Sequence, residues 1–114
     1  MAEGVAAKSA ALETFERLLA AGKDSALLRF SLGNEYMKAA NPNAAVEHLA
    51  RAVAQDADYT AAWKVYGKAL VAAGRHDEAI VAYRDGIAAA KRKGDRQAEK
   101  EMGVFVRRLE KARG

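Results

Sequence analysis

The feature that most constrains the fold of this 114-residue chain is a repeat with a period of 34 residues. Gly33 recurs as Gly67, and Ala45 recurs as Ala79. Each of these alanines is followed four residues later by a large side chain. A fixed period of this length is typical of proteins that stack copies of one helical hairpin. The sequence therefore predicts a helical solenoid, in which each repeat packs on its neighbours, rather than a fold with a single central core.

The residues within one period follow a recognisable order. The second copy reads Trp63-x2-Tyr66-Gly67-x2-Leu70 and then Ala79-x3-Tyr83, and the first copy has Arg29, Leu32, Gly33, Tyr36, Ala45 and Leu49 in the same places. This order resembles the tetratricopeptide repeat (TPR), a helix–turn–helix unit. The resemblance covers about 11–92, because Ala11 and Phe15 continue the period toward the N-terminus. It implies an all-α, TPR-type solenoid of antiparallel helix pairs, with about six helices in a right-handed superhelix.

The small residues on the period predict close contact between paired helices. Glycine inside a helix costs about 1 kcal/mol relative to alanine, so Gly33 and Gly67 indicate places where another helix approaches closely. We expect the periodic alanines and the bulky residues one turn further along to fill this layer. Trp63 is expected to be the largest anchor. Arg29 stands in the same place in the first copy, and we expect its charged head to lie in water.

Turn and capping residues divide the chain into six expected helices. Glycines are expected to end helices, while Asn41-Pro42 and the aspartates or serines that precede apolar runs are expected to begin them. Asp24 or Ser25, Asp58, and Asp77 or His76 are the other expected starts. The expected helices are 5–21, 25–39, 42–55, 59–73, 77–92 and 95–112.

These helices predict a single domain with four parts. They are an N-terminal half repeat (5–23), a first repeat (24–57), a second repeat (58–92) and a C-terminal capping helix (93–114). The last helix leaves the register, because Glu101 stands 34 residues after Gly67. Its apolar residues form one stripe with charge on the other face, as expected of a cap that keeps a repeat stack soluble.

The resemblance implies a protein–protein interaction scaffold without catalysis, which binds a peptide or protein segment in a concave groove. Lys64 and Lys68 lie one turn apart, so an acidic segment would suit the groove. The carboxylate-clamp TPRs are a sharper version, but Phe30 and Val65 stand where that clamp has lysine and asparagine, and only Asn34 matches. The expected groove residues are Leu27, Phe30, Ser31, Asn34, Met37, Lys38, Ala61, Lys64, Val65, Lys68 and Val71.

Two alternative functions use other parts of the surface. From Lys91 onward there are nine of the 19 Lys/Arg residues but only four of the 15 Asp/Glu residues, so the basic character belongs to the C-terminal segment. This segment could bind nucleic acid or another acidic surface. Acidic residues interrupt it, however, so we do not expect nucleic acid to be the partner. Self-association through the ends of the stack is the other alternative. The basic residues are Lys91, Arg92, Lys93, Arg107, Arg108 and Lys111.

Several functional classes lack a signal in the sequence. His48 and His76 are the only histidines, and their spacing is not that of a metal site; we expect both to be surface or capping residues. No nucleophile or phosphate-binding motif is present, so we expect no enzyme activity, no cofactor, no metal and no small-molecule substrate. The chain has no cysteine, no signal peptide pattern and no apolar run of about 20 residues. These features favour a cytoplasmic protein that does not insert into membranes. We expect the chain to be a monomer or to self-associate weakly.

Overall fold

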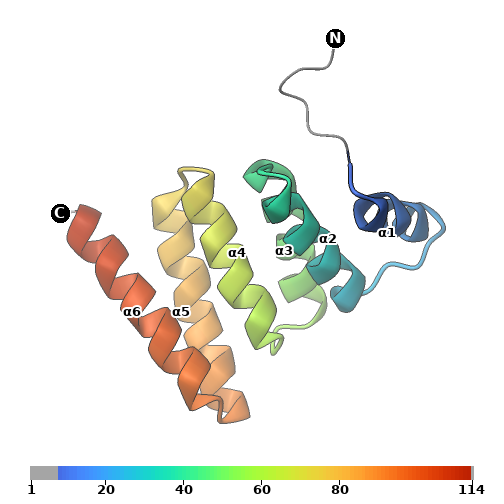
Figure 1. The fold of residues 1–114 in the computed structure, drawn as a ribbon. Helices are drawn as coiled ribbons and strands as arrows, with labels where there is room; N and C mark the ends of the chain where they lie inside the picture. Colours follow the sequence, from blue (N-terminus) through green and yellow to red (C-terminus); the bar gives the residue numbers. More distant parts are fainter. Residues whose placement is uncertain (1–7, 114) are drawn as a thin grey trace.

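The computed structural model describes residues 8–113, which form six α-helices and no strand. The helices succeed one another across a slab of 42 × 31 × 18 Å, with the first and last at opposite ends (Figure 1). This confirms the expected all-α architecture of six helices. Their bounds are α1 (Ala10–Ala20), α2 (Ala26–Lys38), α3 (Pro42–Gln55), α4 (Thr60–Ala72), α5 (His76–Lys93) and α6 (Arg96–Arg113).

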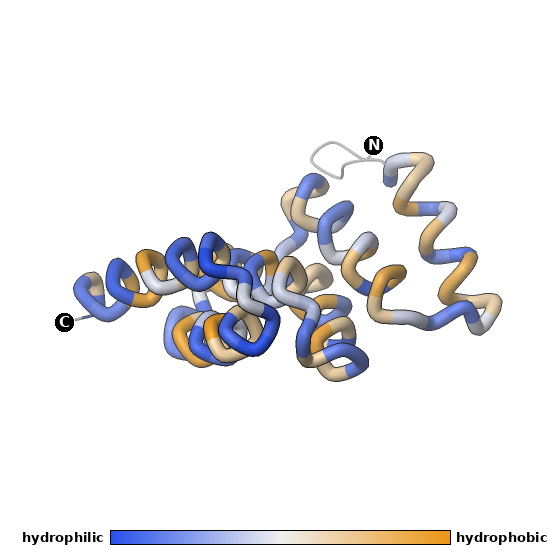
Figure 2. Tube along the Cα trace, turned by 90° about the horizontal axis from the view of Figure 1, so that it is seen from below, coloured by the Kyte–Doolittle hydropathy of each residue, from blue (hydrophilic) through white to orange (hydrophobic). Residues whose placement is uncertain are grey.

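The helices form two layers with different spacing. Each helix contacts the next along the chain, and α2 also contacts α4, as α4 contacts α6. Within the described residues, α1, α3 and α5 make no such contacts with one another. The layer of α2, α4 and α6 is therefore the inner, concave side of the stack, and the other layer is splayed on the convex side. Hydrophobic and hydrophilic residues alternate along the helices, as expected of elements that bury one face (Figure 2).

The glycines on the period lie where paired helices touch. A Cβ built on Gly33 would be 2.4 Å from Cγ of Leu49. A Cβ on Gly67 would be 2.3 Å from Cε1 of Tyr83. Since these distances are far below van der Waals contact, only glycine lets each helix pair approach this closely. The prediction of close packing at both glycines is confirmed, and Ala45 joins Leu49 as a fully buried neighbour.

Trp63 anchors the second repeat but is not fully enclosed. Its ring packs against buried residues of two core clusters, while part of its surface stays accessible. The indole Nε1–H donates a hydrogen bond to the carbonyl oxygen of Ala57 at 2.8 Å. This bond ties the ring to the turn between α3 and α4, so Trp63 joins the two repeats.

Arg29 and His48 differ from their expected positions. The guanidinium of Arg29 binds both carboxylate oxygens of Asp24 at 2.8 Å, and the side chain is only 14% exposed. Its Nη1 donates to Nδ1 of His48 at 3.1 Å. His48 is half-buried and stacks on Tyr36, with ring centroids 5.4 Å apart. The expectations of a water-exposed arginine head and a surface histidine are therefore wrong. Arg29 is held by Asp24, and His48 by its hydrogen bond with Arg29 and its stacking on Tyr36.

Some helix boundaries also differ from the expected ones. The first helix begins at Ala10, because the hydroxyl of Ser9 accepts the backbone N–H of Leu12 and caps it. The expected start at Val5 lies outside the described residues. Asp58 does not cap α4; its carboxylate instead accepts a hydrogen bond from Arg92 at 2.7 Å. Ser25 rather than Asp24 caps α2, and α5 starts at His76 without a side-chain cap.

Candidate protein-binding groove

The third helix of the concave layer is α6, although its sequence is shifted relative to the 34-residue period. The helix before it, α5, has 18 residues, four more than its counterpart α3, which has 14. The turn after it has two residues fewer, 94–95 instead of 56–59. The net shift of two residues makes Gly103 the eighth residue of α6, as Gly67 is the eighth of α4. Besides closing the stack, α6 therefore supplies a wall of the concave face.

A hollow of about 240 Å³ lies between α4 and α6 on this face. Its floor is Tyr83 of α5, which is 2% exposed and packs against Phe105 with ring centroids 5.2 Å apart. Burial raises the pKa of the Tyr83 hydroxyl to about 12, so the floor is uncharged at neutral pH. Val71 and Leu109 complete an apolar lining, and Lys68 and Arg108 stand at the rim.

The two rim cations have no acidic partner within residues 8–113. The neighbouring carboxylates are already engaged: Glu101 accepts from Lys64 at 3.0 Å, and Glu110 pairs with Arg84. No carboxylate oxygen lies within 4.0 Å of the charged nitrogens of Lys68 or Arg108. The hollow thus combines an apolar floor with two exposed positive charges. This arrangement suits an apolar side chain that has a carboxylate beside it.

The residues expected in the groove on α2 do not all present free side chains. Phe30 packs on Tyr59 with ring centroids 4.9 Å apart, and Met37 packs against the main core cluster. The Ser31 hydroxyl donates to the carbonyl oxygen of Leu27 within the same helix at 2.9 Å. Lys38 lies 3.2 Å from Glu35. Asn34 is half-buried, and Leu27, at 65% exposed, is the most open apolar residue of the set.

The residues expected on α4 separate into engaged and available ones. Lys64 forms the ion pair with α6, so it does not act with Lys68 as a pair of exposed cations. Val65 packs against the main core cluster, and Ala61 is exposed near the start of the helix. Of the residues expected on α4, only Lys68 and Val71 line the hollow between α4 and α6.

Four lining residues were absent from the expected groove: Tyr83, Phe105, Arg108 and Leu109. Sequence reasoning assigned the α6 residues to a capping helix or to a basic patch. The signal that could have revealed them is Gly103, which restores the glycine position if the period is allowed two extra residues.

The basic C-terminal segment does not form one continuous patch. Arg92 binds the Asp58 carboxylate and the carbonyl oxygen of Ala57, and Lys91 lies 4.0 Å from Glu99. Arg107 and Arg108 line different hollows on α6. The positive charge of this segment is therefore divided between ion pairs and separate surfaces.

Neither metal ligation nor membrane insertion finds support in the described residues. Between residues 8 and 113, no three His, Asp or Glu side chains gather closely enough to hold a metal ion. None of the six helices combines the length and the apolar character needed to cross a bilayer.

Comparison with known proteins gives a consistent result. A family model described as tetratricopeptide repeat matches residues 36–98. The TPR repeat-containing protein PA0015 of Pseudomonas aeruginosa is 51% identical over 102 residues, which cover 90% of this chain and 97% of that protein. The solution structure of protein BPP2914 from Bordetella parapertussis has a TM-score of 0.77 and 42% identity, over 91% of this chain and 90% of that one. The similarity therefore extends over nearly the whole length in sequence and in fold.

Proposed function

Since this chain belongs to the tetratricopeptide repeat family, we propose that it is a non-catalytic adaptor that binds an extended segment of another protein on its concave face. TPR repeats generally mediate protein–protein interaction, and here α2, α4 and α6 supply the inner layer on which a segment would lie. We also propose that residues 24–57 and 58–92 are the two full repeats. A cytoplasmic location is proposed as well, and the absence of cysteine favours it.

The observation that carries the proposal is the hollow between α4 and α6. Its apolar lining would take one aliphatic or aromatic side chain of the segment, and an adjacent Asp, Glu or terminal carboxylate would lie between Lys68 and Arg108. An acidic partner segment is therefore favoured over a neutral one. The contact would be modest in strength, because both cations are exposed to solvent.

A peptide array tests this proposal. Its peptides carry Leu or Phe next to Asp or Glu, and matched peptides replace the acid with Asn or Gln. We expect the acidic set to bind more strongly, and the double variant Lys68→Glu, Arg108→Glu to weaken that binding by about tenfold or more. The double variant Lys23→Glu, Lys100→Glu is the control, because it changes the net charge equally at two exposed lysines outside the hollow. Equal loss in both variants, or no preference for acidic peptides, would reject the proposed groove.

Self-association through the α1 end is a second candidate, favoured by the exposure of α1. Leu18 is 41% exposed and Ala11 is exposed, although Ala45 and Ala52, their counterparts one period later, are fully buried. Sedimentation velocity over a range of concentrations tests this candidate. If α1 mediates association, Leu18→Lys abolishes it, and Leu27→Lys, in the groove, leaves it unchanged.

A further inference from the structure

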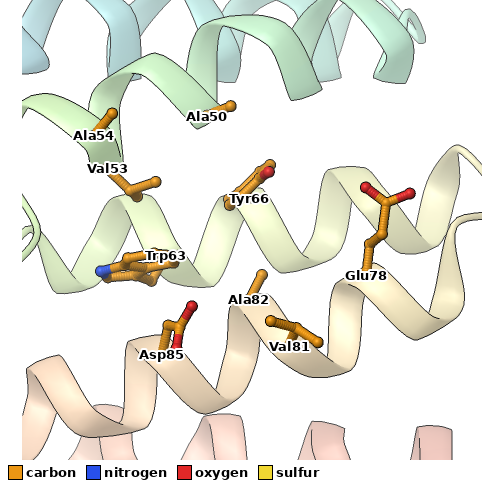
Figure 3. Close-up of a pocket in the computed structure, with 9 residues that line it drawn as sticks. All are labelled: Ala50, Val53, Ala54, Trp63, Tyr66, Glu78, Val81, Ala82 and Asp85. Carbon is orange, nitrogen blue, oxygen red and sulfur yellow. The ribbon is translucent and has the colours of Figure 1, made fainter.

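A second hollow, of about 430 Å³, lies on the convex side of the stack, away from the proposed groove. Figure 3 shows α3 and α5 on either side of it, with Trp63 and Tyr66 projecting from α4 between them. The backbones of α3 and α5, both fully described, leave this space, because no Cα atom of one helix lies within 8 Å of a Cα atom of the other. The nine lining residues are Ala50, Val53, Ala54, Trp63, Tyr66, Glu78, Val81, Ala82 and Asp85.

Two aromatic rings form the base of this convex hollow. The centroids of Trp63 and Tyr66 are 6.2 Å apart, and the planes are tilted by 44°. The hydrogen bond from the indole Nε1–H to Ala57 holds the tryptophan ring in place, so it is an ordered surface. Both side chains are partly accessible. The face of an aromatic ring carries negative electrostatic potential and attracts cations, and tryptophan does so most strongly.

The charged groups of the convex hollow are acidic. Glu78 and Asp85 line it, and no lysine or arginine does. Glu78 is held by Arg75 through two hydrogen bonds, at 2.9 and 2.7 Å. Asp85 takes part in none of the ion pairs among residues 8–113. Its carboxylate points toward the indole ring (Figure 3). Among residues 8–113 this carboxylate has no basic partner, and it lies beside an aromatic face.

An aliphatic wall completes the arrangement. Val81 is 57% exposed, although it is a large apolar residue in the middle of α5, and it lies one turn before Asp85. Val53 and Ala54 of α3 face the hollow from the opposite side (Figure 3). A ligand that fits these surfaces has a hydrocarbon stem and a cationic, planar end group.

We propose that the convex hollow receives an arginine side chain of a partner protein. The stem would lie along Val81, the guanidinium would stack on Trp63, and Asp85 would accept its hydrogen bonds. Arginine suits the hollow better than lysine, because its head is planar, stacks on rings, binds carboxylates through two N–H groups and is more weakly hydrated. The recognition is opposite in sign to that of the concave groove, and the two hollows share no lining residue.

The single tryptophan makes a direct test possible. Trp63 is the only tryptophan of the chain, so its indole N–H gives one resonance in the ¹⁵N-labelled protein. The probes are N-acetyl-arginine methylamide and the uncharged analogue N-acetyl-citrulline methylamide, titrated at constant ionic strength. We expect the arginine probe to shift the indole resonance in a saturable way, with a Kd in the millimolar range, and the citrulline probe to give no saturable shift.

Variants separate recognition from incidental contact. Asp85→Asn should weaken binding of the arginine probe by about three- to fivefold, the effect of losing one exposed charged partner. Glu47→Gln removes one negative charge at an exposed position of α3 outside the hollow and should leave the Kd unchanged. Because both residues are exposed, neither substitution should disturb the fold. The amide spectrum of each variant checks that it is folded. Equal shifts with arginine and citrulline, an unchanged Kd in Asp85→Asn, or no indole shift at all would overturn the proposal.

Discussion

At the residue scale, the turn after α2 contains an unusual backbone conformation. Ala40 has φ of +56°, in the left-handed region where a Cβ is unfavourable. Gly74, one period later, has φ of +76°, and it follows α4 in the same way. Ala40 therefore takes the glycine conformation without being glycine, and the first repeat carries a local strain that the second does not.

Replacing Ala40 with glycine should relieve this strain. We expect Ala40→Gly to raise the free energy of unfolding by about 0.5–1 kcal/mol. Removing the Cβ relieves steric strain in the left-handed conformation, and this relief exceeds the extra conformational entropy that glycine loses on folding. Chemical denaturation monitored by circular dichroism measures the change. The reverse substitution Gly74→Ala is the control and should destabilise the protein. A less stable Ala40→Gly variant would contradict the account.

His48 predicts a pH dependence of stability. Burial, assisted by the nearby charge of Arg29, lowers the pKa of His48 below its ordinary value of about 6.5. Arginine can only donate, so Nδ1 of His48 accepts and the ring is neutral in the folded state. The unfolded chain therefore binds a proton at higher pH than the folded one, and stability falls as pH drops through and below about 6.5.

Removing the His48 titration should flatten this dependence. Denaturation of His48→Gln between pH 7.5 and 5 is expected to show a shallower loss of stability than the wild type, since glutamine can still accept from Arg29 but does not titrate. Identical slopes for His48→Gln and the wild type would contradict the assignment.

At the scale of the helix, the eighth residue of α2, α4 and α6 is glycine in each case, but the surroundings differ. Gly33 and Gly67 face the helix that follows them, whereas a Cβ on Gly103 would meet only Nη1 of Arg107, at 3.5 Å. The sequence predicted the first two contacts because the period repeats both partners. It did not predict the position of α6, because the longer α5 and the shorter turn shift the register by two residues.

Gly67 and Gly103 should respond differently to replacement by alanine. Gly67→Ala forces a Cβ into the ring of Tyr83 and should destabilise the protein by about 1–3 kcal/mol, the usual cost of overpacking. Gly103→Ala meets only a flexible side chain and should stabilise α6 by about 0.5–1 kcal/mol through helix propensity. Thermal and denaturant melts of the two variants give the comparison. Destabilisation of similar size in both would show that helix contact is not the cause.

At the scale of the whole molecule, the buried residues do not form one continuous core. Leu12, Leu28 and Leu32 make a separate cluster that joins α1 to α2, while the main cluster lies in α3 to α6. Tyr36 also donates a partly buried hydrogen bond to the carboxylate of Glu16, which adds a polar contact between α2 and α1. In a stack of this kind stability is a sum of local terms, so the α1 end can open by itself.

Truncation of one leucine in each cluster should separate local from global opening. Leu12→Ala is expected to accelerate amide hydrogen exchange in α1 and the start of α2, with little change in α4 to α6. Leu70→Ala, in the main cluster and 1% exposed, should accelerate exchange throughout α3 to α6. Each truncation is expected to cost about 2–5 kcal/mol in its own region. Uniform acceleration along the chain in Leu12→Ala would indicate a single cooperative unit.

The fold was predictable because the small and the large residues that pack together recur at the same positions in each repeat. The candidate site was less predictable, because it depends on contacts between helices that the period does not encode. Lys64 and Lys68 look alike in the sequence, yet only Lys64 reaches Glu101. Likewise, Arg108 becomes a groove residue only through the position of α6. Such pairings are decided by which side chains meet after the helices have stacked.

The helix α4 forms a wall of both hollows. Its residues Lys68 and Val71 line the concave one, and Trp63 and Tyr66 line the convex one. A ligand that displaces this helix as a rigid rod would reshape both hollows at once. Affinity on one side would then change with occupancy on the other, by the same factor in both directions. Binding of an acidic partner in the concave hollow would in this way alter the affinity for a basic partner in the convex hollow, across a slab only 18 Å thick.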